Sequence, residues 1–381
     1  MTLRHKIEEE IRERGPIPFS RYIELCLYDP ELGYYSRNAE QFGKAGDFYT
    51  SSDVHAVFGR LMARQFDEMW RLLGSPSQIE ILELGPGRGL FAQDVLDWSE
   101  KKFSEFFEAL HYSLAERSPA LRERLQTTLR GQLEKGKASL VPPAGVAIKK
   151  TLAPEVPIIV FANEFFDALP VEVISSQGEL HISENDGRLA ETWTEASAAA
   201  LEFLDRYSVH PEAKERIEAA LVAQQYMSEI ATAVKRGFII AIDYGYTRQE
   251  QLAGRHRGTI TAYRQHSVSA NLYEAPGEQD ITAHVNFTAL AAAAEEHGLQ
   301  VQSLLTQSQF LLGIGQHNQF AEAFEDCRLP QEHAKVALQL KHLVTPAGMG
   351  ESFHVLLASK RVDTAKVTEL SGLTFGKAAQ L

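Results

Sequence analysis

The sequence has little cysteine and no long apolar run, and both absences narrow the classes of protein to consider. Only two cysteines, Cys26 and Cys327, occur among 381 residues. They form neither a CxxC pair nor a metal-ligand spacing, so we expect no disulfide framework and no metal site, and a reducing compartment fits best. No stretch of about eighteen apolar residues is present, which predicts that the chain does not associate with a membrane by spanning it.

The chain also lacks an excess of basic residues. It has 38 Lys and Arg against 51 Asp and Glu, a formal net charge of −13. Because binding to nucleic acid needs clustered Lys and Arg to neutralise phosphates, this balance predicts no nucleic-acid partner. An acidic surface favours a basic partner, although it is also the ordinary charge of a cytosolic protein. The first residues, MTLRHKIEEEIRERG, resemble neither a secretory signal nor an Arg-rich transit peptide, so we predict a cytoplasmic location.

Apolar strands that end in carboxylates alternate with helical segments along the chain. Hydrophobic residues make up 44% and charged residues 23% of the sequence, as in a soluble globular protein. The run at 158–161 is continuously apolar, which is typical of a strand buried on both faces of a parallel sheet. The alternation predicts an α/β fold with a doubly wound sheet.

The sequence is organised around residues 79–96, IEILELGPGRGLFAQDVL. A short strand leads into Glu83, a turn carries Gly85, Gly87 and Gly89, and an amphipathic helix follows. Glycines without a Cβ allow the backbone to approach a ligand, and the helix N-terminus presents N–H groups to it. The G-P-G-R-G spacing is one residue too tight for the dinucleotide pattern GxGxxG, which argues against a nicotinamide cofactor. A packing turn is the alternative interpretation of this motif alone.

Polar side chains stand at the carboxyl ends of two further predicted strands. Glu116 ends the strand at 111–116, where a carboxylate can accept hydrogen bonds from both ribose hydroxyls; a solvated acid is the alternative. Asn163 and Glu164 follow the strand at 158–161, and Asp167 comes shortly after them, where it could equally cap a helix. Ligands bind outside the carboxyl ends of parallel strands, so these side chains are candidates for the active site.

The pattern divides the chain into parts and marks two loops. Residues 43–52 contain Gly46 and Asp47 and have the composition of a ligand lid. Residues 257–290 read as a long loop, rich in polar and aromatic residues, that includes His266 and His284. The predicted parts are an N-terminal helical and lid region (1–75), a cofactor-binding domain (76–171 and 237–360), an inserted β/helical substrate-side region (172–236) and a C-terminal tail (361–381). Within the insertion, residues from about 195 to 235 are predicted to be helical.

Several motifs, in matching order, resemble one family. They are GKAGDFYTSSDVHAVFG, LELGPGRG, ANEFFDALP, DYGY, RGTITAYRQH and PGEQDITAHVNF. The chain resembles the MidA-like family of S-adenosyl-L-methionine (SAM)-dependent methyltransferases, whose mitochondrial members look like complex I assembly factors that methylate arginine. The resemblance implies a class I methyltransferase fold, which is Rossmann-like, with an inserted substrate-side region. It also implies SAM as the cofactor, bound by residues Gly46, Asp47, Glu83, Gly85, Gly87, Gly89, Glu116 and Asn163.

Methyl transfer to a guanidinium, a charged and delocalised nucleophile, needs a carboxylate that grips its N–H groups. Glu164 is the first candidate for this catalytic role and Asp167 the second, while His266 or His284 could take the proton. We therefore predict methyl transfer to a protein side chain, most simply arginine, with a protein substrate as partner. A small-molecule methyltransferase and a non-catalytic assembly factor are the alternatives, and a homodimer is left open.

Overall fold

The computed structural model describes residues 2–37, 56–143, 156–264, 267–269 and 271–375. The predicted site residues Gly46, Asp47 and His266 lie outside the described residues.

The main sheet has the order β15-β16-β10-β5-β2-β3-β4, with β14 paired to β10. Of these paired strands, β16 alone runs opposite to the others, and the remaining pairs are parallel. The strands are β2 (Ile79–Leu84), β3 (Leu110–Ala115), β4 (Ala138–Val141), β5 (Ile158–Asn163), β10 (Gly237–Tyr246), β14 (Val285–Asn286), β15 (Gln300–Thr306) and β16 (Phe353–Lys360).

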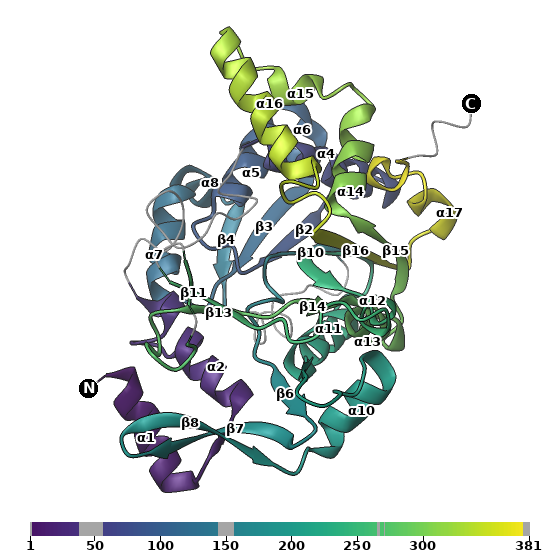
Figure 1. Ribbon diagram of the computed structural model, residues 1–381. Helices are drawn as coiled ribbons and strands as arrows, with labels where there is room; N and C mark the ends of the chain where they lie inside the picture. The colour runs from purple at the N-terminus through teal and green to yellow at the C-terminus, as the bar shows by residue number, and fades with distance from the viewer. Residues whose placement is uncertain (1, 38–55, 144–155, 265–266, 270, 376–381) are drawn as a thin grey trace.

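Both faces of the main sheet are buried beneath helices. Along β5, Ile159 and Phe161 belong to one hydrophobic cluster, whereas Val160 and Ala162 belong to another. The first cluster includes side chains of α4 (Ala56–Leu72), α5 (Leu90–Lys102) and α14 (Gln307–Gln316), and the second those of α11 (Leu221–Ala233) and α13 (Phe287–Glu296). Figure 1 shows α4, α5 and α14 above the sheet and α11 and α13 below it. The α/β fold with a doubly wound sheet is confirmed.

A second sheet joins the N-terminus to the segment after β5. Its order is β1-β7-β6-β9, and β8 pairs with β7. The N-terminal helices α1 (Leu3–Arg14) and α2 (Phe19–Tyr28) flank it at the lower end of the view in Figure 1. The strands are β1 (Ile17–Pro18), β6 (Glu172–Ser175), β7 (Gly178–Asn185), β8 (Arg188–Thr194) and β9 (Arg216–Ala219).

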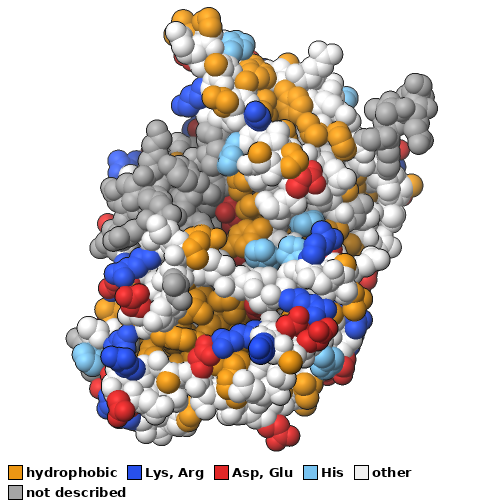
Figure 2. Space-filling model, in the orientation of Figure 1, with side chains coloured by type: hydrophobic (Ala, Val, Ile, Leu, Met, Phe, Trp, Pro, Cys, Tyr) orange, Lys and Arg blue, Asp and Glu red, His pale blue; other side chains and the backbone are white. Residues whose placement is uncertain are grey.

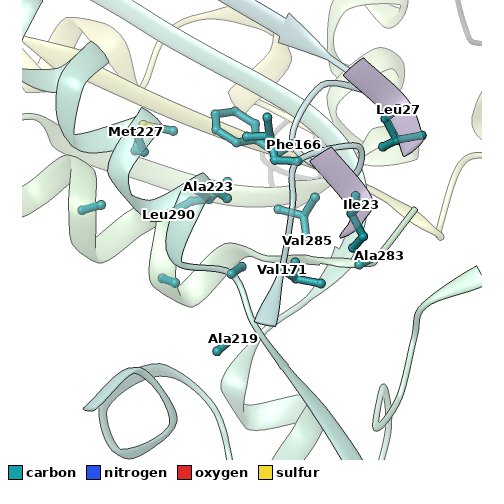
Figure 3. Close-up of a cluster of buried hydrophobic side chains, with 14 of the residues drawn as sticks. Ile23, Leu27, Phe166, Val171, Ala219, Ala223, Met227, Ala283, Val285 and Leu290 are labelled. Carbon is teal, nitrogen blue, oxygen red and sulfur yellow. The ribbon is translucent and has the colours of Figure 1, made fainter. Parts of the chain in front are cut away.

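The two sheets meet in a shared hydrophobic core. Ile23 and Leu27 of α2 lie close to Phe166 and Val171, which follow β5, and to Val285 of β14 (Figure 3). All five side chains are buried. Burial of a side chain of this size contributes about 1.5–3 kcal/mol. The core therefore fixes α2 against the segment that carries Glu164 and Asp167.

Two sequence predictions of local structure were wrong. The segment 195–235 is not continuously helical, because β9 separates α10 (Ala198–Tyr207) from α11. Ile217 and Ala219 of β9 are buried against β6, so tertiary pairing overrides the helical pattern there. The segment 257–290 is not a plain loop either: it forms a three-stranded sheet of β12 (Ser267–Ser269), β11 (Thr261–Arg264) and β13 (Asp280–Thr282). These strands are short and lie in a polar segment, so the sequence pattern did not predict them.

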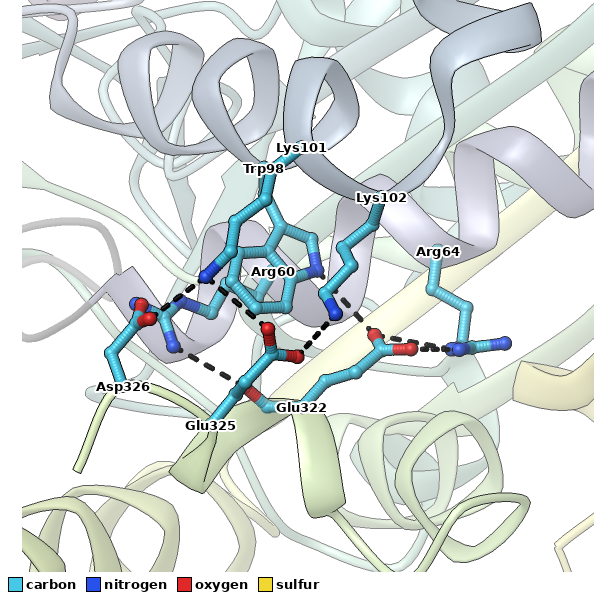
Figure 4. Close-up of polar contacts among 8 residues, drawn as sticks. All are labelled: Arg60, Arg64, Trp98, Lys101, Lys102, Glu322, Glu325 and Asp326. Carbon is cyan, nitrogen blue, oxygen red and sulfur yellow. Dashed lines mark hydrogen bonds and ion pairs between the residues drawn. The ribbon is translucent and has the colours of Figure 1, made fainter. Parts of the chain in front are cut away.

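An ionic cluster ties α15 (Ala321–Phe324) and the residues after it to α4 and α5 (Figure 4). Glu322 accepts hydrogen bonds from Arg64 and from the indole N–H of Trp98, while Arg60 lies 4.3 Å from the Trp98 ring. The cluster is remote from the carboxyl ends of the strands and serves to hold the helices together. The other helices are α6 (Ser104–Ala109), α7 (Pro119–Thr128), α8 (Arg130–Glu134), α12 (Arg248–Leu252), α16 (Pro330–Val344), α17 (Thr364–Val367) and the 3-10 turns η1 (Tyr34–Ser36) and η2 (Ser371–Leu373).

Residues after the last strand return to α4. The backbone N–H groups of Ser371 and Gly372 donate to Glu68 Oε2 and Gln65 Oε1, both at 2.9 Å. Across the part of the chain that the structure describes, no helix combines the length and the apolar character needed to cross a bilayer.

Candidate active site

A cavity of about 780 Å³ lies at the carboxyl ends of β2, β3 and β5 and reaches α2. Its volume falls within the range of small-molecule sites. Seven of the predicted site residues line it: Glu83, Gly85, Gly87, Glu116, Asn163, Glu164 and Asp167. The cavity is also lined by three tyrosines and an aspartate: Tyr28, Tyr35, Tyr244 and Asp280.

The glycine turn provides open backbone on one side of the cavity. Gly85, Gly87 and Gly89 have φ values of 66°, 53° and 78°, the left-handed region that disfavours other residues. A Cβ at Gly87 would meet nothing within 4 Å, whereas one at Gly89 would lie 2.6 Å from Leu125 Cδ2. Gly87 thus leaves space for a ligand. Gly89 instead serves packing and begins α5, so it lies behind the cavity wall.

Two buried carboxylates face this turn. The Tyr112 hydroxyl donates to Glu83 Oε2 at 2.9 Å, and the Ser118 N–H donates to Glu116 Oε1 at 2.8 Å. Burial raises the pKa of Glu83 to about 8 and that of Glu116 to about 7. The negative charge of Glu116 adds to the first of these shifts. A ligand that donates hydrogen bonds from hydroxyl or ammonium groups would favour the ionised forms of both, so the pair fits the ribose and amino groups of SAM.

The turn after β5 carries the other predicted side chains. Glu164 has a φ of 50°, unusual for a residue with a Cβ, and Asn163 Nδ2 donates to Glu164 Oε1 at 3.1 Å. Asn163 Oδ1 and Asp167 Oδ1 are buried and accept no hydrogen bond from the described residues. Burial raises the pKa of Asp167 to about 6. Such orphaned oxygens are costly unless a ligand supplies donors.

Asp243 lies in β10, three residues before its end, and no role was predicted for it from the sequence. Its Oδ2 accepts hydrogen bonds from the backbone N–H groups of Phe165, Phe166 and Asp167 at 3.2, 3.0 and 3.2 Å. Burial, followed by the negative charges of Asp167 and Glu164, raises the pKa of Asp243 well above its usual range. The motif DYGY at the end of a strand was the only sequence signal for this residue.

Tyr28 and Tyr35 form an aromatic wall of the cavity that was not predicted from the sequence. The Tyr28 hydroxyl donates to the Ala168 carbonyl and the Tyr35 hydroxyl to Asp280 Oδ1, both at 2.9 Å. The two rings lie 5.6 Å apart. Tyr35 and Asp280 are 245 positions apart in the sequence, so no local pattern could have joined them.

No histidine among the described residues lines the cavity, and His284 lies next to it, against Tyr244. Figure 2 shows histidine side chains gathered near the middle of one face. The Nδ1 atoms of His256 and His284 are 3.2 Å apart, and the His284 ring packs edge-on against Tyr244. Burial, helped by His256, lowers the pKa of His284 to about 4, so its ring is neutral at physiological pH. Within the described ranges, no group of three or more His, Cys, Asp or Glu side chains is placed to hold a metal ion.

Comparison with known proteins decides the chemistry. The sequence model of the family Methyltransf_28, described as "Putative S-adenosyl-L-methionine-dependent methyltransferase", matches residues 61–305, more than half of the chain. The chain belongs to this family. It is a SAM-dependent methyltransferase, so SAM is its cofactor, and the resemblance noted in the sequence is confirmed.

A solved relative supports the fold and the cofactor. A COG1565 superfamily member from Burkholderia thailandensis, bound to S-adenosyl-homocysteine (SAH), is 27% identical with a TM-score of 0.80. The match covers 95% of this chain and 92% of that one. This likeness confirms the class I methyltransferase fold. Which residues bind the cofactor stays a prediction.

Curated relatives carry a more specific name. Protein arginine methyltransferase NDUFAF7 homolog, mitochondrial, of Drosophila melanogaster is 28% identical over 380 residues, covering 93% of this chain and 84% of the relative. Protein arginine methyltransferase NDUFAF7, mitochondrial, of Danio rerio is 29% identical over 377 residues, covering 92% and 85%. The mitochondrial relatives contradict the predicted cytoplasmic location, and that prediction was wrong. It rested on the composition of the first residues, the low cysteine content and the lack of a long apolar run, none of which identifies the compartment of the family.

Proposed function

We propose that this methyltransferase transfers the methyl group of SAM to an arginine side chain of a protein. The observation that carries the proposal is the group of carboxylates at one end of the cavity. Glu164 and Asp167 line it, Asp243 lies directly behind them, and the buried Oδ1 of Asp167 accepts no hydrogen bond from the described residues. A cationic acceptor with several N–H donors satisfies this group, and the guanidinium of arginine is such a cation.

In the proposed arrangement, the cofactor occupies the end of the cavity near the glycine turn. Gly85 and Gly87 allow the cofactor to approach the backbone closely, and Glu116 accepts hydrogen bonds from the ribose hydroxyls. The side chains of Glu83 and Asn163 line the same end of the cavity. SAM supplies an electrophilic methyl group on a sulfonium. Gly46 and Asp47 keep their predicted cofactor-binding role, outside the described residues.

The carboxylate end then has two tasks. Glu164 grips the N–H groups of the guanidinium and concentrates electron density on the nitrogen that attacks. A carbon–nitrogen bond forms as the carbon–sulfur bond breaks, and the attacking nitrogen gives up one proton. Asp167, whose pKa lies near 6, accepts that proton when it is ionised. His266 stays a predicted alternative for this step.

The acceptor belongs to a protein in this proposal. Relatives named as protein arginine methyltransferases support it, because they match nearly the whole chain. The net charge of −13 favours encounter with a basic, arginine-containing segment. A homodimer and the absence of a nucleic-acid partner stay predictions.

The test is transfer of isotope-labelled methyl from SAM to proteins of a cell lysate, followed by hydrolysis and identification of the labelled amino acid. Labelled methylarginine is the expected product. Label recovered only in small molecules would contradict the proposal and favour a metabolite as acceptor. Tight binding of SAH without any transfer would instead favour a non-catalytic assembly factor.

A further inference from the structure

Asp243 is buried in a way that serves its neighbours rather than a ligand. Its side chain is 0% exposed and does not line the cavity. Both carboxylate oxygens are directed at backbone: Oδ2 accepts three N–H groups of the turn after β5, and Oδ1 accepts the N–H of Tyr244 at 3.0 Å. Four backbone donors occupy about all of the acceptor sites of one carboxylate.

The turn that Asp243 holds is strained at its first residue. Glu164 adopts a φ of 50°, a conformation that costs a residue with a Cβ about 1 kcal/mol or more. Its own N–H donates to the Ile242 carbonyl of β10 at 2.9 Å. At the other end of the turn, the Asp167 carbonyl accepts the N–H of Ala283 at 3.0 Å. Asp243 sits in the middle of these attachments and aligns three successive N–H groups.

We propose that Asp243 is the positioning residue of the acceptor site, which holds the 164–167 turn so that Glu164 and Asp167 face the substrate. The inference rests on the proposed function, because it takes these two side chains to be the ones that meet the guanidinium. A displacement of a reacting group by about 1 Å can cost 100-fold in rate, so a carboxylate that fixes this turn acts on catalysis without touching the substrate.

An acidic side chain at position 243 has an electrostatic cost and a hydrogen-bonding benefit. It places a third carboxyl group beside Glu164 and Asp167, whose negative charges oppose its ionisation, and Tyr28 of α2, Asp280 of β13 and Tyr244 of β10 face the same cluster. A neutral side chain could fill the same volume without this repulsion. The backbone N–H donors of the turn favour the ionised form, whose charge-assisted hydrogen bonds are roughly twice as strong as neutral ones and so hold the turn more firmly.

The test compares Asp243→Asn with a matched control, Glu218→Gln. Glu218 is also buried, 2% exposed, and its Oε1 also accepts two backbone N–H groups, those of Thr259 and Ile260. It does not line the cavity. Both variants replace a buried carboxylate with the isosteric amide in the full-length protein. Asp243→Glu, which keeps the charge, serves as the conservative variant.

Three readouts separate positioning from general stability. In Asp243→Asn, amide hydrogen exchange of the peptide spanning 163–169 should accelerate about tenfold, because the turn loses charge-assisted bonds. Formation of methylarginine in the lysate assay should fall about 100-fold, whereas the affinity for SAH stays unchanged. Asp243→Glu, which keeps the carboxylate, should restore part of the lost rate, and Glu218→Gln should change none of the three.

Several results would overturn the inference. Unchanged exchange in the 163–169 peptide would show that Asp243 does not hold the turn. Faster exchange with an unaltered rate, or a loss of SAH affinity as large as the loss of rate, would show a role in packing alone. If the wild type itself forms no methylarginine, the proposed function fails, while hydrogen exchange and SAH affinity still decide whether Asp243 holds the turn.

Discussion

The cofactor end of the cavity and the acceptor end are built from different kinds of sequence. Glu83, Gly85 and Gly87 follow one another on β2 and its turn, and Glu116 ends the next strand, β3. The acceptor end instead combines the turn after β5 with Asp243 of β10 and with side chains of α2 and β13. Hydrogen bonds there join residues up to 245 positions apart.

The difference indicates how the two functions are divided. The proposed cofactor end lies on one strand–turn–helix unit and on the parallel strand beside it, so it depends on the main sheet alone. The acceptor end depends on how the N-terminal helices and the second sheet dock against the main sheet. We infer that changes in this docking alter the substrate while the cofactor stays the same. The predictions below test whether the two ends are separable.

Glu164→Gln should have the largest effect. Loss of the carboxylate removes the charge that grips the guanidinium, so methylarginine formation should fall by about 100-fold or more. SAH affinity, measured by titration calorimetry, should stay at the wild-type value. Glu80→Gln is the control, since Glu80 lies on β2 and bonds to His111 away from the cavity. Activity retained in Glu164→Gln would refute the proposed grip.

Glu116→Gln should weaken binding of the cofactor, at the other end of the cavity. Replacing the carboxylate weakens the hydrogen bonds from the ribose hydroxyls, and bonds to charged groups contribute about 1.5–3 kcal/mol. We expect SAH to bind at least about tenfold more weakly, with transfer largely restored at saturating SAM. Unchanged SAH affinity would place the ribose elsewhere.

The two turn glycines should separate affinity from stability. Alanine at either position costs about 1–2 kcal/mol for the left-handed backbone. At Gly89 the Cβ also overlaps Leu125, which adds about 1–3 kcal/mol. Gly89→Ala should therefore unfold at lower denaturant than Gly87→Ala, while Gly87→Ala should lose more SAH affinity. Equal stability of the two variants would contradict the packing role of Gly89.

Glu83 should make the stability of the cofactor-free protein depend on pH. Its folded-state pKa, about 8, lies above the usual value of 4.5, so folding favours the protonated form. Its contribution is fully present below pH 4.5 and is lost as the pH rises through about 8. Denaturation at a series of pH values should show this decline, and Glu83→Gln should flatten it. A decline of the same slope in Glu83→Gln would assign it to other groups.

Tyr35→Phe should have the smallest effect. The variant removes the hydroxyl that donates to Asp280, a bond worth about 0.5–1.5 kcal/mol. The concentration of lysate protein that gives half-maximal transfer should rise a few-fold, with SAH affinity unchanged. Tyr273→Phe is the control, because Tyr273 also donates to a carboxylate, Glu191, but outside the cavity. An effect on SAH affinity would mean that the aromatic wall belongs to the cofactor end.

The same contrast explains how far the sequence could predict the molecule. Strand burial and the glycine spacing were sufficient for the main sheet and for the placement of Glu83, Glu116 and Glu164, because these signals are local. Asp243 was visible only as the end of a strand, since its three partners lie on another segment. Tyr35 and Asp280 could not be joined at all. The strand β9 was missed because its burial against β6 outweighs its helical context.

The most direct measurement is a crystal structure of the protein with SAH bound. We expect the ribose hydroxyls to donate to Glu116, the cofactor to follow the backbone of Gly85 and Gly87, and the side chains of Glu164 and Asp167 to lie in front of the sulfur without being covered by SAH. SAH that covers the 164–167 turn, or a ribose bound away from Glu116, would contradict the division of the cavity into a cofactor end and an acceptor end.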